Sequence, residues 1–298
     1  MNLRELLTNI KDIELEEAKD LTKYSTMRLK AQGDLITVRS IEALKETLPT
    51  LTSKGISYRV LGLGANQLLP ELSVIPFIKL ALPFKSSYLD EVREIYELPA
   101  SVTLSKLSSH AIKNGLSGWE SFTGIPATLG GAVFMNAGTN LGEIGTLIRE
   151  VRIINKLGEL RVEVINETSF SYRKNHFLKE GDVVVSVSMG HLGVDPAITD
   201  KIKNYLDLRN RTQPLKEWTC GCIFENSKLE RTCLAGKFID ILGLKGLSHN
   251  GLRISPKHAN FMENVDNAGR EDVVALIKII KDELRLQYGV EFETEVKL

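Results

Sequence analysis

The feature that most constrains the fold is a run of small and apolar residues, GIPATLGGAVFMNAG, which extends from Gly124 to Gly138. Glycine and alanine carry no side chain large enough to hold a neighbouring molecule away, so such a backbone can pass close to a flat ligand. The alternative interpretation is that the glycines only allow strands to cross tightly. The run therefore indicates either a cradle for a rigid ligand or an unusually tight piece of packing.

A second glycine-rich segment, GLGANQ at residues 62–67, follows the apolar stretch Tyr58–Leu61. A glycine turn directly after a strand can point several backbone N–H groups at one place, and such a nest binds the oxygens of a diphosphate. Gln67 stands where a complete G-x-G-x-x-G motif has its third glycine. By itself the segment is thus compatible with an ordinary turn as well as with a phosphate site.

The spacing of apolar residues changes along the chain and predicts an α+β fold. Apolar residues repeat at helical spacing in several stretches, and they alternate with polar residues between Val151 and Val187. We expect a βαβ unit over 35–64, an antiparallel region over 151–187, a short strand at 223–224, and helices at 41–51, 104–114, 197–208, 237–242 and 271–287. Gly115 is expected to end the second of these helices. This order of elements contains no internal repeat.

Composition limits the partners of the chain. Lysine plus arginine equals aspartate plus glutamate at 38 each, so the net charge gives no reason to expect nucleic acid or an anionic membrane. The acidic, amphipathic start does not resemble an export signal, and no stretch approaches the roughly 18 apolar residues of a membrane span, so we expect a cytoplasmic protein. The three cysteines, Cys220, Cys222 and Cys233, lack metal-ligand spacing. We therefore expect reduced thiols and no metal site.

The two glycine-rich segments also carry a family resemblance. Together with Thr26-Met27-Arg28, they resemble the FAD-binding half of the UDP-N-acetylenolpyruvoylglucosamine reductases. That family shares the vanillyl-alcohol-oxidase or PCMH-type FAD-binding fold, which has two subdomains followed by a C-terminal α+β substrate-binding domain. The resemblance implies FAD-binding subdomains at 1–75 and 76–204 and a substrate-binding domain at 205–298.

Motifs in the second half of the chain narrow the resemblance. Phe170-Ser171-Tyr172-Arg173 looks like the Tyr-Arg motif of the family, Gly221-Cys222-Ile223-Phe224-Glu225-Asn226 looks like its Gly-Ser/Cys-x-Phe-x-Asn motif, and Glu293-Thr294-Glu295-Val296 looks like its C-terminal Glu-Val motif. Segments 235–237, 243–246 and 255–261 lie between the last two of these motifs, in the expected order. Only 48 residues separate Arg173 from Cys222, so the chain is similar to the shorter subclass, which lacks a substrate-covering insertion.

The resemblance implies a reaction in which non-covalently bound FAD accepts hydride from NADPH and passes it from N5 to the double bond of UDP-N-acetylglucosamine enolpyruvate. Cys222 stands where the family places its proton donor, usually a serine, and a thiol with a reference pKa of about 8.5 is the better acid. Arg173 would hold the substrate carboxylate as negative charge develops on it. Glu295 would polarise that carboxylate or orient the donor.

The resemblance also implies two sets of binding residues. The expected cofactor-binding residues are Gly62, Leu63, Gly64, Ala65, Asn66, Gln67, Gly124, Ile125, Pro126, Thr128, Gly130, Gly131, Ala132, Asn136, Ala137 and Gly138. The expected contacts to the UDP-sugar are Arg209, Arg211, Asn226, Lys257, His258 and Lys297. Taken singly, each residue of the second set is also typical of an ordinary polar surface.

Several residues depart from the family pattern. The segment GLGANQ replaces a GGGSN-type sequence, Ala127 replaces the commoner glycine after Pro126, and Glu225 stands where a basic residue is common. These departures question the efficiency of the reaction more than its type. Two alternatives follow: another flavin oxidoreductase of the same FAD fold, and a catalytically idle homologue that binds FAD or a UDP-sugar. We expect a monomer in each case.

Overall fold

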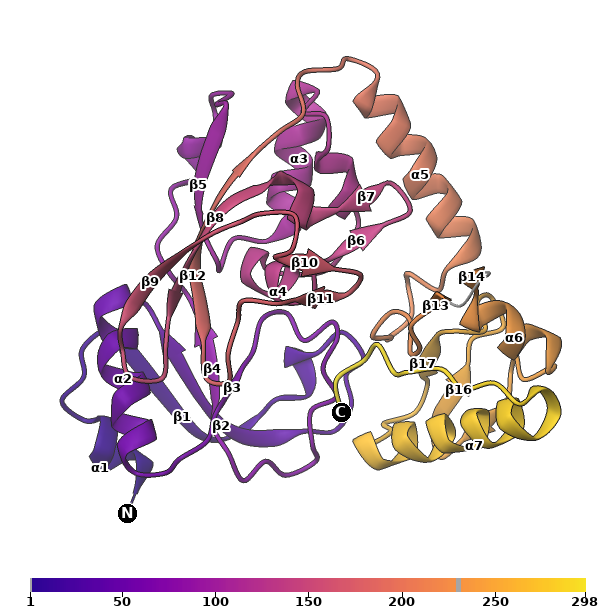
Figure 1. Cartoon of the computed structure of the whole chain (residues 1–298). Helices are drawn as coiled ribbons and strands as arrows, with labels where there is room; N and C mark the ends of the chain where they lie inside the picture. Colours follow the sequence, from indigo (N-terminus) through magenta and orange to yellow (C-terminus); the bar gives the residue numbers. More distant parts are fainter. Residues whose placement is uncertain (1, 229–231) are drawn as a thin grey trace. The chain divides into compact units, whose positions relative to one another are not determined.

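The computed structural model describes residues 2–228 and 232–298 (Figure 1). Contacts between Cα atoms divide these residues into two compact units. Unit 1 contains the residues up to Ala18, Asp34–Gly62 and Val74–Leu206, and unit 2 contains Lys19–Gly33, Leu63–Ser73 and Asp207–Leu298. The division into three domains, with boundaries near residues 75 and 204, stays a prediction.

The first sheet of unit 1 has the strand order β1-β2-β4-β3. Its strands are β1 (Ile13–Asp20), β2 (Gln32–Val38), β3 (Arg59–Val60) and β4 (Phe77–Leu80). β2 and β3 both run parallel to β4, and the helix α2 (Ile41–Ser53) lies between β2 and β3 in the chain. The expected βαβ unit is therefore confirmed, with a helix two residues longer than expected. α1 (Leu3–Leu7) and α2 contribute buried leucines to the core beside this sheet.

The second sheet of unit 1 is antiparallel throughout, as the alternating pattern predicts. Its order is β5-β12-β8-β9, with β5 at Ile95–Pro99, β8 at Ile148–Ile154, β9 at Leu160–Val164 and β12 at Val183–Gly190. The helices α3 (Leu104–Asn114) and α4 (Leu129–Phe134) lie beside this sheet (Figure 1). Their shared core contains fully buried Trp119 and Phe122. α3 ends at Gly115, whose φ of +67° is the left-handed conformation expected of a helix stop.

The other elements of unit 1 are short and connect these layers. They are the strands β6 (Gly138–Thr139), β7 (Gly142–Glu143), β10 (Phe170–Ser171) and β11 (Lys174–Asn175) and the 3-10 helices η2 (Ser86–Leu89), η3 (Trp119–Phe122) and η4 (Ile144–Leu147). β6 pairs with β7 and β10 pairs with β11, so both pairs form small hairpins.

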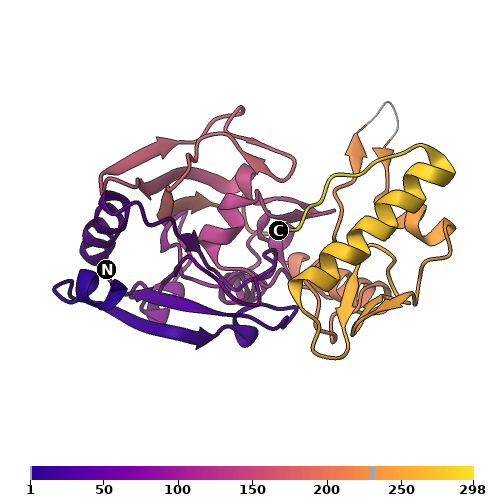
Figure 2. The ribbon, with the colours of Figure 1, turned by 90° about the horizontal axis from the view of Figure 1, so that it is seen from below.

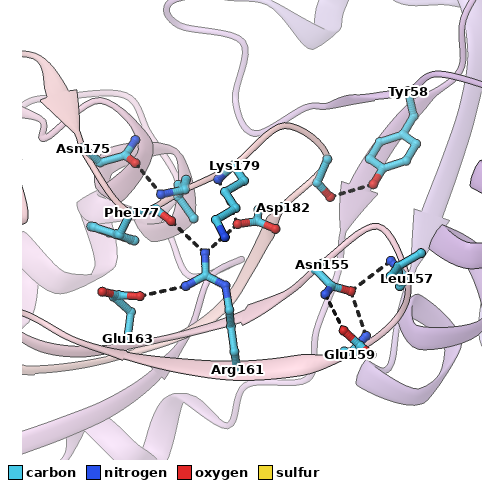
Figure 3. Close-up of polar contacts among 12 residues, drawn as sticks. Tyr58, Asn155, Leu157, Glu159, Arg161, Glu163, Asn175, Phe177, Lys179 and Asp182 are labelled. Carbon is cyan, nitrogen blue, oxygen red and sulfur yellow. Dashed lines mark hydrogen bonds and ion pairs between the residues drawn. The ribbon is translucent and has the colours of Figure 1, made fainter.

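A buried ion pair ties β9 to the chain just before β12, as Figure 3 shows. Arg161 on β9 donates at 2.6 Å to Asp182, whose side chain is only 3% exposed, and also to the carbonyl of Phe177 and to Glu163. Beside it, the Tyr58 hydroxyl donates to the carbonyl of Gly181 at 2.6 Å. Burial, with a further contribution from Asp182, raises the pKa of Tyr58 to about 12. Within this cluster Asp182 is the buried charge, since the side chains of Arg161 and Glu163 are 30% and 33% exposed.

A buried histidine lies within the aromatic core of unit 1. The His110 ring is hydrogen-bonded through Nε2 to the Tyr96 hydroxyl at 2.9 Å and through Nδ1 to the Asn114 side chain at 3.0 Å, and Trp119 packs against it. Burial lowers the pKa of His110 below its ordinary value of 6.5. The unfolded chain therefore takes up a proton at this residue at a higher pH than the folded chain does.

We expect this histidine to make unit 1 less stable in weak acid. Stability is fully present above pH 6.5 and is lost as the pH falls toward the folded-state pKa, by at most about 1.4 kcal/mol per pH unit for one proton. Urea unfolding at pH 7.5, 6.5 and 5.5 measures the effect, and His110→Gln should show the smaller decrease. The pKa of His258 is also lowered by burial, and this residue is present in wild type and in His110→Gln alike. Equal decreases in the two proteins would therefore assign the acid sensitivity to His258 or another group and contradict the role of His110.

Unit 2 is built from three separate chain segments around one apolar core. Its elements are η1 (Thr22–Tyr24), the hairpin β13 (Ser227–Lys228) and β14 (Thr232–Cys233), the sheet β15 (Ser248–His249), β16 (Leu252–Ile254) and β17 (Met262–Asn264), and the helices α6 (Ala235–Ile241) and α7 (Arg270–Tyr288). The last turns of α5 (Ile198–Thr212) also belong to it. α7 packs on β16 and β17 through its buried face (Figure 2).

The predicted helices of unit 2 are confirmed, but the predicted strand at 223–224 is wrong. Cys222 pairs with Phe261 on one side and Phe224 pairs with Thr294 on the other, each as a single bridge. The apolar run is buried, as expected. It pairs with residues 293–295 on one side only, and on the other side the Asn260 side chain bonds both backbone groups of Phe224, so the bridges stay single and no strand forms. Among the described residues, no helix is both long and apolar enough to cross a membrane.

Candidate functional site

The glycine loop at residues 62–67 leaves a group of backbone donors uncommitted. The N–H of Leu61 donates to Ile78, yet within the described residues the N–H groups of Leu63, Gly64 and Ala65 donate no hydrogen bond. Gly64 has a φ of +62°, and a Cβ there would collide with the Tyr24 carbonyl oxygen. The close approach explains why only glycine fits this position. Such a run of uncommitted N–H groups is suited to an anion such as a diphosphate.

The small-residue run in unit 1 presents backbone in place of side chains. Gly124 and Gly131 are exposed, and Thr128 caps α4 by accepting a hydrogen bond from the Gly131 N–H at 3.3 Å. A Cβ added to Gly62 would lie 2.9 Å from the Thr128 Oγ1 atom, and one added to Gly130 would lie 2.9 Å from the Cβ of Ala100. The end of β3 and the start of α4 therefore meet at a place where side chains do not fit.

Asn136 is committed to the protein and not open to a ligand. It is 1% exposed, and its side chain donates to Glu143 and to the Ser171 carbonyl and accepts from the Gly145 N–H. Its role in the structure is to hold the β10–β11 hairpin against the end of the small-residue run. The Arg173 side chain, on that same hairpin, donates to the carbonyl of Gly138 at 3.2 Å.

Arg173 has an unusual backbone conformation. The hairpin register pairs Ser171 with Lys174, so Tyr172 and Arg173 form a two-residue turn, and Arg173 adopts a φ of +59°. A non-glycine residue in this region costs of order 1–3 kcal/mol and is kept only where surrounding contacts enforce it. The guanidinium carbon of Arg173 lies 4.8 Å from the centroid of the Tyr172 ring, so the ring face also holds the side chain in place.

The two neighbouring cysteines of unit 2 occupy different environments. Cys220 is 4% exposed within the apolar core, and burial, with a contribution from the charge of Glu295, raises its pKa to about 12. Cys222 is partly exposed and follows Gly221, whose φ is +82°. The turn at Gly221 therefore brings one thiol into the core and leaves the other at the surface. Of these two thiols, Cys222 is the one that a ligand can reach.

The C-terminal segment joins the Cys222 segment to the glycine loop within unit 2. The Glu295 N–H donates to the Ile223 carbonyl at 2.8 Å, and the Asn66 side chain donates to the Glu295 carbonyl at 3.0 Å. Lys297 continues the pairing, because its N–H donates to the carbonyl of Asn66 and its carbonyl accepts from Leu68. An expected cofactor residue, Asn66, thus lies directly beside the expected acid Glu295.

Glu295 and Glu293 differ in burial. Glu293 is exposed, whereas Glu295 is partly buried next to Val296, which is 1% exposed in the core. The backbones of both residues are hydrogen-bonded, and the role of Glu295 stays a prediction.

The expected substrate residues all lie in unit 2, but several are already engaged. The Lys257 ammonium donates to the carbonyl of Asn210 near the end of α5 at 2.7 Å, and Asn226 accepts from the N–H of Ala235 at the start of α6. His258 accepts from the Asn260 N–H at 3.2 Å, and burial lowers its pKa, so the ring is neutral at pH 7.

The remaining substrate candidates are less constrained. Arg209 donates to Gln213 at 2.9 Å, Arg211 is exposed on α5, and Lys297 is exposed beside the glycine loop.

Two hydroxyl groups were missed as site residues by the sequence prediction. Thr26 Oγ1 and Ser121 Oγ are buried and have no hydrogen-bond partner within the described residues. The Thr26 N–H donates to the Gly64 carbonyl, so this threonine lies against the glycine loop, and Ser121 precedes Gly124 by three residues. Buried hydroxyls normally have partners, which marks both as candidates for contact with a ligand. The sequence signal for Thr26 was its place in the Thr26-Met27-Arg28 motif.

Known proteins match this chain over nearly its whole length. Residues 213–298 match the C-terminal domain of UDP-N-acetylenolpyruvoylglucosamine reductase, and residues 35–162 match an FAD binding domain. The UDP-N-acetylenolpyruvoylglucosamine reductase of Chlamydia pneumoniae is 35% identical over 280 residues, which are 93% of this chain and 90% of that protein. The corresponding protein of Halalkalibacterium halodurans is 32% identical over 301 residues and covers 99% of both.

A solved structure agrees with these matches. The crystal structure of UDP-N-acetylenolpyruvylglucosamine reductase (MurB) from Thermus caldophilus superposes with a TM-score of 0.78 at 31% identity, over 96% of this chain and 98% of that chain. The predicted α+β class and FAD-binding fold are thereby confirmed. The chain belongs to the family of UDP-N-acetylenolpyruvoylglucosamine reductases, and its N-terminal part contains the FAD-binding domain of that family.

Proposed function

We propose that this enzyme reduces UDP-N-acetylglucosamine enolpyruvate to UDP-N-acetylmuramate, a peptidoglycan precursor, with FAD as cofactor and NADPH as hydride donor. The observation that carries the proposal is the continuous chain of hydrogen bonds from Asn66 to Glu295 and from Glu295 to the Cys222 segment. It links an expected cofactor loop, an expected acid and an expected proton donor inside one compact unit.

The residues of the glycine loop fit the diphosphate of FAD. Leu63, Gly64 and Ala65 offer N–H groups that no protein acceptor within the described residues takes, and the buried Thr26 hydroxyl lies beside them. The redox chemistry would come from bound FAD, which accepts hydride from NADPH and delivers it to the enolpyruvyl double bond. The protein is left to bind the substrate, stabilise its carboxylate and supply one proton.

Cys222 is the proton donor in this proposal. Addition of hydride to one carbon of the double bond leaves negative charge on its neighbour, and the Cys222 thiol donates the proton that completes the new C–H bond. The thiolate that remains regains a proton from solvent. Cys220 is unsuited to this role, since it is buried and its pKa of about 12 keeps it protonated in the core.

Arg173 stabilises the negative charge that develops before the proton arrives, and Glu295 either polarises the substrate carboxylate in its protonated form or orients the donor. Arg173 is a permanent cation on a rigid hairpin turn, and its planar guanidinium suits the substrate carboxylate. The N–H of Glu295 donates to the Ile223 carbonyl, and its main-chain carbonyl accepts from the Asn66 side chain. These two bonds fix the backbone of Glu295 beside the segment that carries the donor. Arg209, Arg211, Asn226, Lys257, His258 and Lys297 are proposed to contact the UDP-sugar.

The decisive experiment follows the flavin colour in two anaerobic steps. Purified protein with FAD is mixed first with NADPH and then with UDP-N-acetylglucosamine enolpyruvate, and the flavin absorbance is recorded. The proposal predicts bleaching in the first step and recovery in the second. Bleaching without recovery would indicate another flavin oxidoreductase or an idle homologue, and protein without affinity for FAD would contradict the assignment of the cofactor.

The Thr26 hydroxyl offers a test of the cofactor site. Thr26→Val keeps the side-chain shape but removes the unpartnered hydroxyl, so we expect the dissociation constant for FAD to rise about tenfold, as for one lost hydrogen bond. Stability of the FAD-free protein should stay equal or increase, because no protein partner is lost. Fluorescence titration of FAD and thermal unfolding measure the two quantities.

Thr22→Val is the matched control for this test. The Thr22 hydroxyl already has a protein partner in Asp20 at the exposed start of η1, so its loss should leave FAD affinity unchanged. Unchanged FAD affinity in Thr26→Val, together with lower stability, would mean that the hydroxyl serves the protein alone.

A further inference from the structure

Asn260 binds the backbone of the Cys222 segment with its side chain. Its side-chain carboxamide accepts from the Phe224 N–H at 2.9 Å and donates to the Phe224 carbonyl at 2.9 Å. The main-chain carbonyl of Asn260 accepts from the Ile223 N–H at 2.9 Å. The residue is 3% exposed, so these bonds lie in the interior of unit 2. Three hydrogen bonds from one buried residue therefore fix two consecutive backbone units directly after Cys222.

The C-terminal segment holds the other side of the same two residues. The Ile223 carbonyl accepts from Glu295, and the Glu225 N–H donates to the Glu293 carbonyl at 2.9 Å. The Cys222 segment thus lies between Asn260 and the segment that carries Glu295. Any shift of Ile223 and Phe224 along the chain would change the offset between the Cys222 thiol and the Glu295 carboxyl group.

Only an asparagine side chain can make this contact. A carboxamide has one donor and one acceptor side, as a peptide group has, and can therefore satisfy both backbone groups of one residue. Aspartate lacks the donor, and its charge would be buried. Glutamine carries the same carboxamide on a side chain one methylene longer, so its donor and acceptor would not meet the two backbone groups of Phe224 at the same positions. The fit is specific to both the chemistry and the length of Asn260.

We infer that Asn260 is a positioning residue for proton delivery: its carboxamide sets the register between Cys222 and Glu295 without touching the substrate. The inference rests on the proposed role of Cys222. Misplacement of a reacting group by about 1 Å can slow a step on the order of 100-fold. Loss of Asn260 should therefore impair the step that uses the thiol and spare the step that does not.

The test separates the two half-reactions in Asn260→Ala and Asn260→Asp. With FAD saturating, we expect flavin reduction by NADPH to stay within about twofold of wild type, while reoxidation by the enolpyruvyl substrate falls on the order of 10- to 100-fold. A second measurement follows alkylation of Cys222 by iodoacetamide against pH, with the modified peptide identified by mass. The midpoint of this profile should shift in the variants, because the thiol would no longer be held at the same offset from Glu295.

Asn264→Ala is the matched control. Asn264 is also buried, at 4% exposure, and its side chain makes three hydrogen bonds, to Met27, Arg28 and Ala268, where the Asn260 side chain makes two. It should lower stability as Asn260→Ala does, yet leave the ratio of the two half-reactions and the alkylation profile as in wild type.

The outcomes distinguish this inference from the proposed function. A wild-type protein that fails to reoxidise with the enolpyruvyl substrate would overturn the function itself. If wild type reoxidises and Cys222→Ala does not, but Asn260→Ala matches wild type in both measurements, the function stands and the positioning role is refuted. Equal losses in both half-reactions of Asn260→Ala would also refute it, because they would indicate general structural damage.

Discussion

Cys222→Ala is expected to slow flavin reoxidation by UDP-N-acetylglucosamine enolpyruvate by about 10²- to 10⁴-fold, the usual contribution of a general acid. Flavin reduction by NADPH should remain within about twofold, because that step does not use the thiol proton. Cys222 is partly exposed behind the Gly221 turn, so the loss of its sulfur should cost little stability. Anaerobic stopped-flow measurement of each half-reaction provides the two rates.

Two further variants serve as controls for Cys222→Ala. Cys222→Ser restores a hydroxyl donor and should keep measurable turnover, at a lower rate than the thiol because an alcohol is a weaker acid. Cys220→Ala removes the buried neighbour and should lower stability while it leaves both half-reactions largely intact. A comparable loss in both half-reactions of Cys222→Ala would show that this thiol supports folding or flavin binding and is not the donor.

Arg161→Met is expected to lower the free energy of unfolding by about 3 kcal/mol. Methionine keeps the apolar stem but removes the guanidinium. The buried carboxylate of Asp182 then keeps the N–H of Lys179 as a donor within the cluster of Figure 3 but has lost its cation. An uncompensated buried charge costs far more than the loss of a surface pair. Urea unfolding at pH 7 and low salt gives the value.

An exposed pair in the same unit is the control. Arg39 and Glu14 are 2.6 Å apart, but their side chains are 53% and 52% exposed, so Arg39→Met should cost no more than about 1 kcal/mol. The double variant Arg161→Met with Asp182→Asn should recover part of the lost stability, since the buried charge is then removed. If Arg161→Met and Arg39→Met lower the free energy of unfolding by the same small amount, water must screen the charge of Asp182 well.

Local structure could be predicted from the sequence because it depends on short-range patterns. The periodicity of apolar residues identified α3 and the antiparallel region, and Gly115 marked the helix end, since left-handed backbone angles favour glycine. The failure at Ile223 and Phe224 is equally instructive. An apolar pair signals burial, but a strand needs backbone pairing that continues along the chain. Here the pairing with residues 293–295 is a single bridge, and the side chain of Asn260 takes the backbone groups of Phe224 on the other side.

The sequence by itself determined the types and order of the functional residues, because small residues, an arginine after a tyrosine and a thiol in a glycine turn are local features. The tertiary structure alone decided which of them meet. Asn66 and Glu295 are 229 positions apart, and their hydrogen bond follows from the packing of three chain segments on one core. Similarly, the left-handed angle of Arg173 follows from the register of β10 with β11. Neither relation leaves a periodic signal, since each depends on the backbone groups that remain available once the fold has formed.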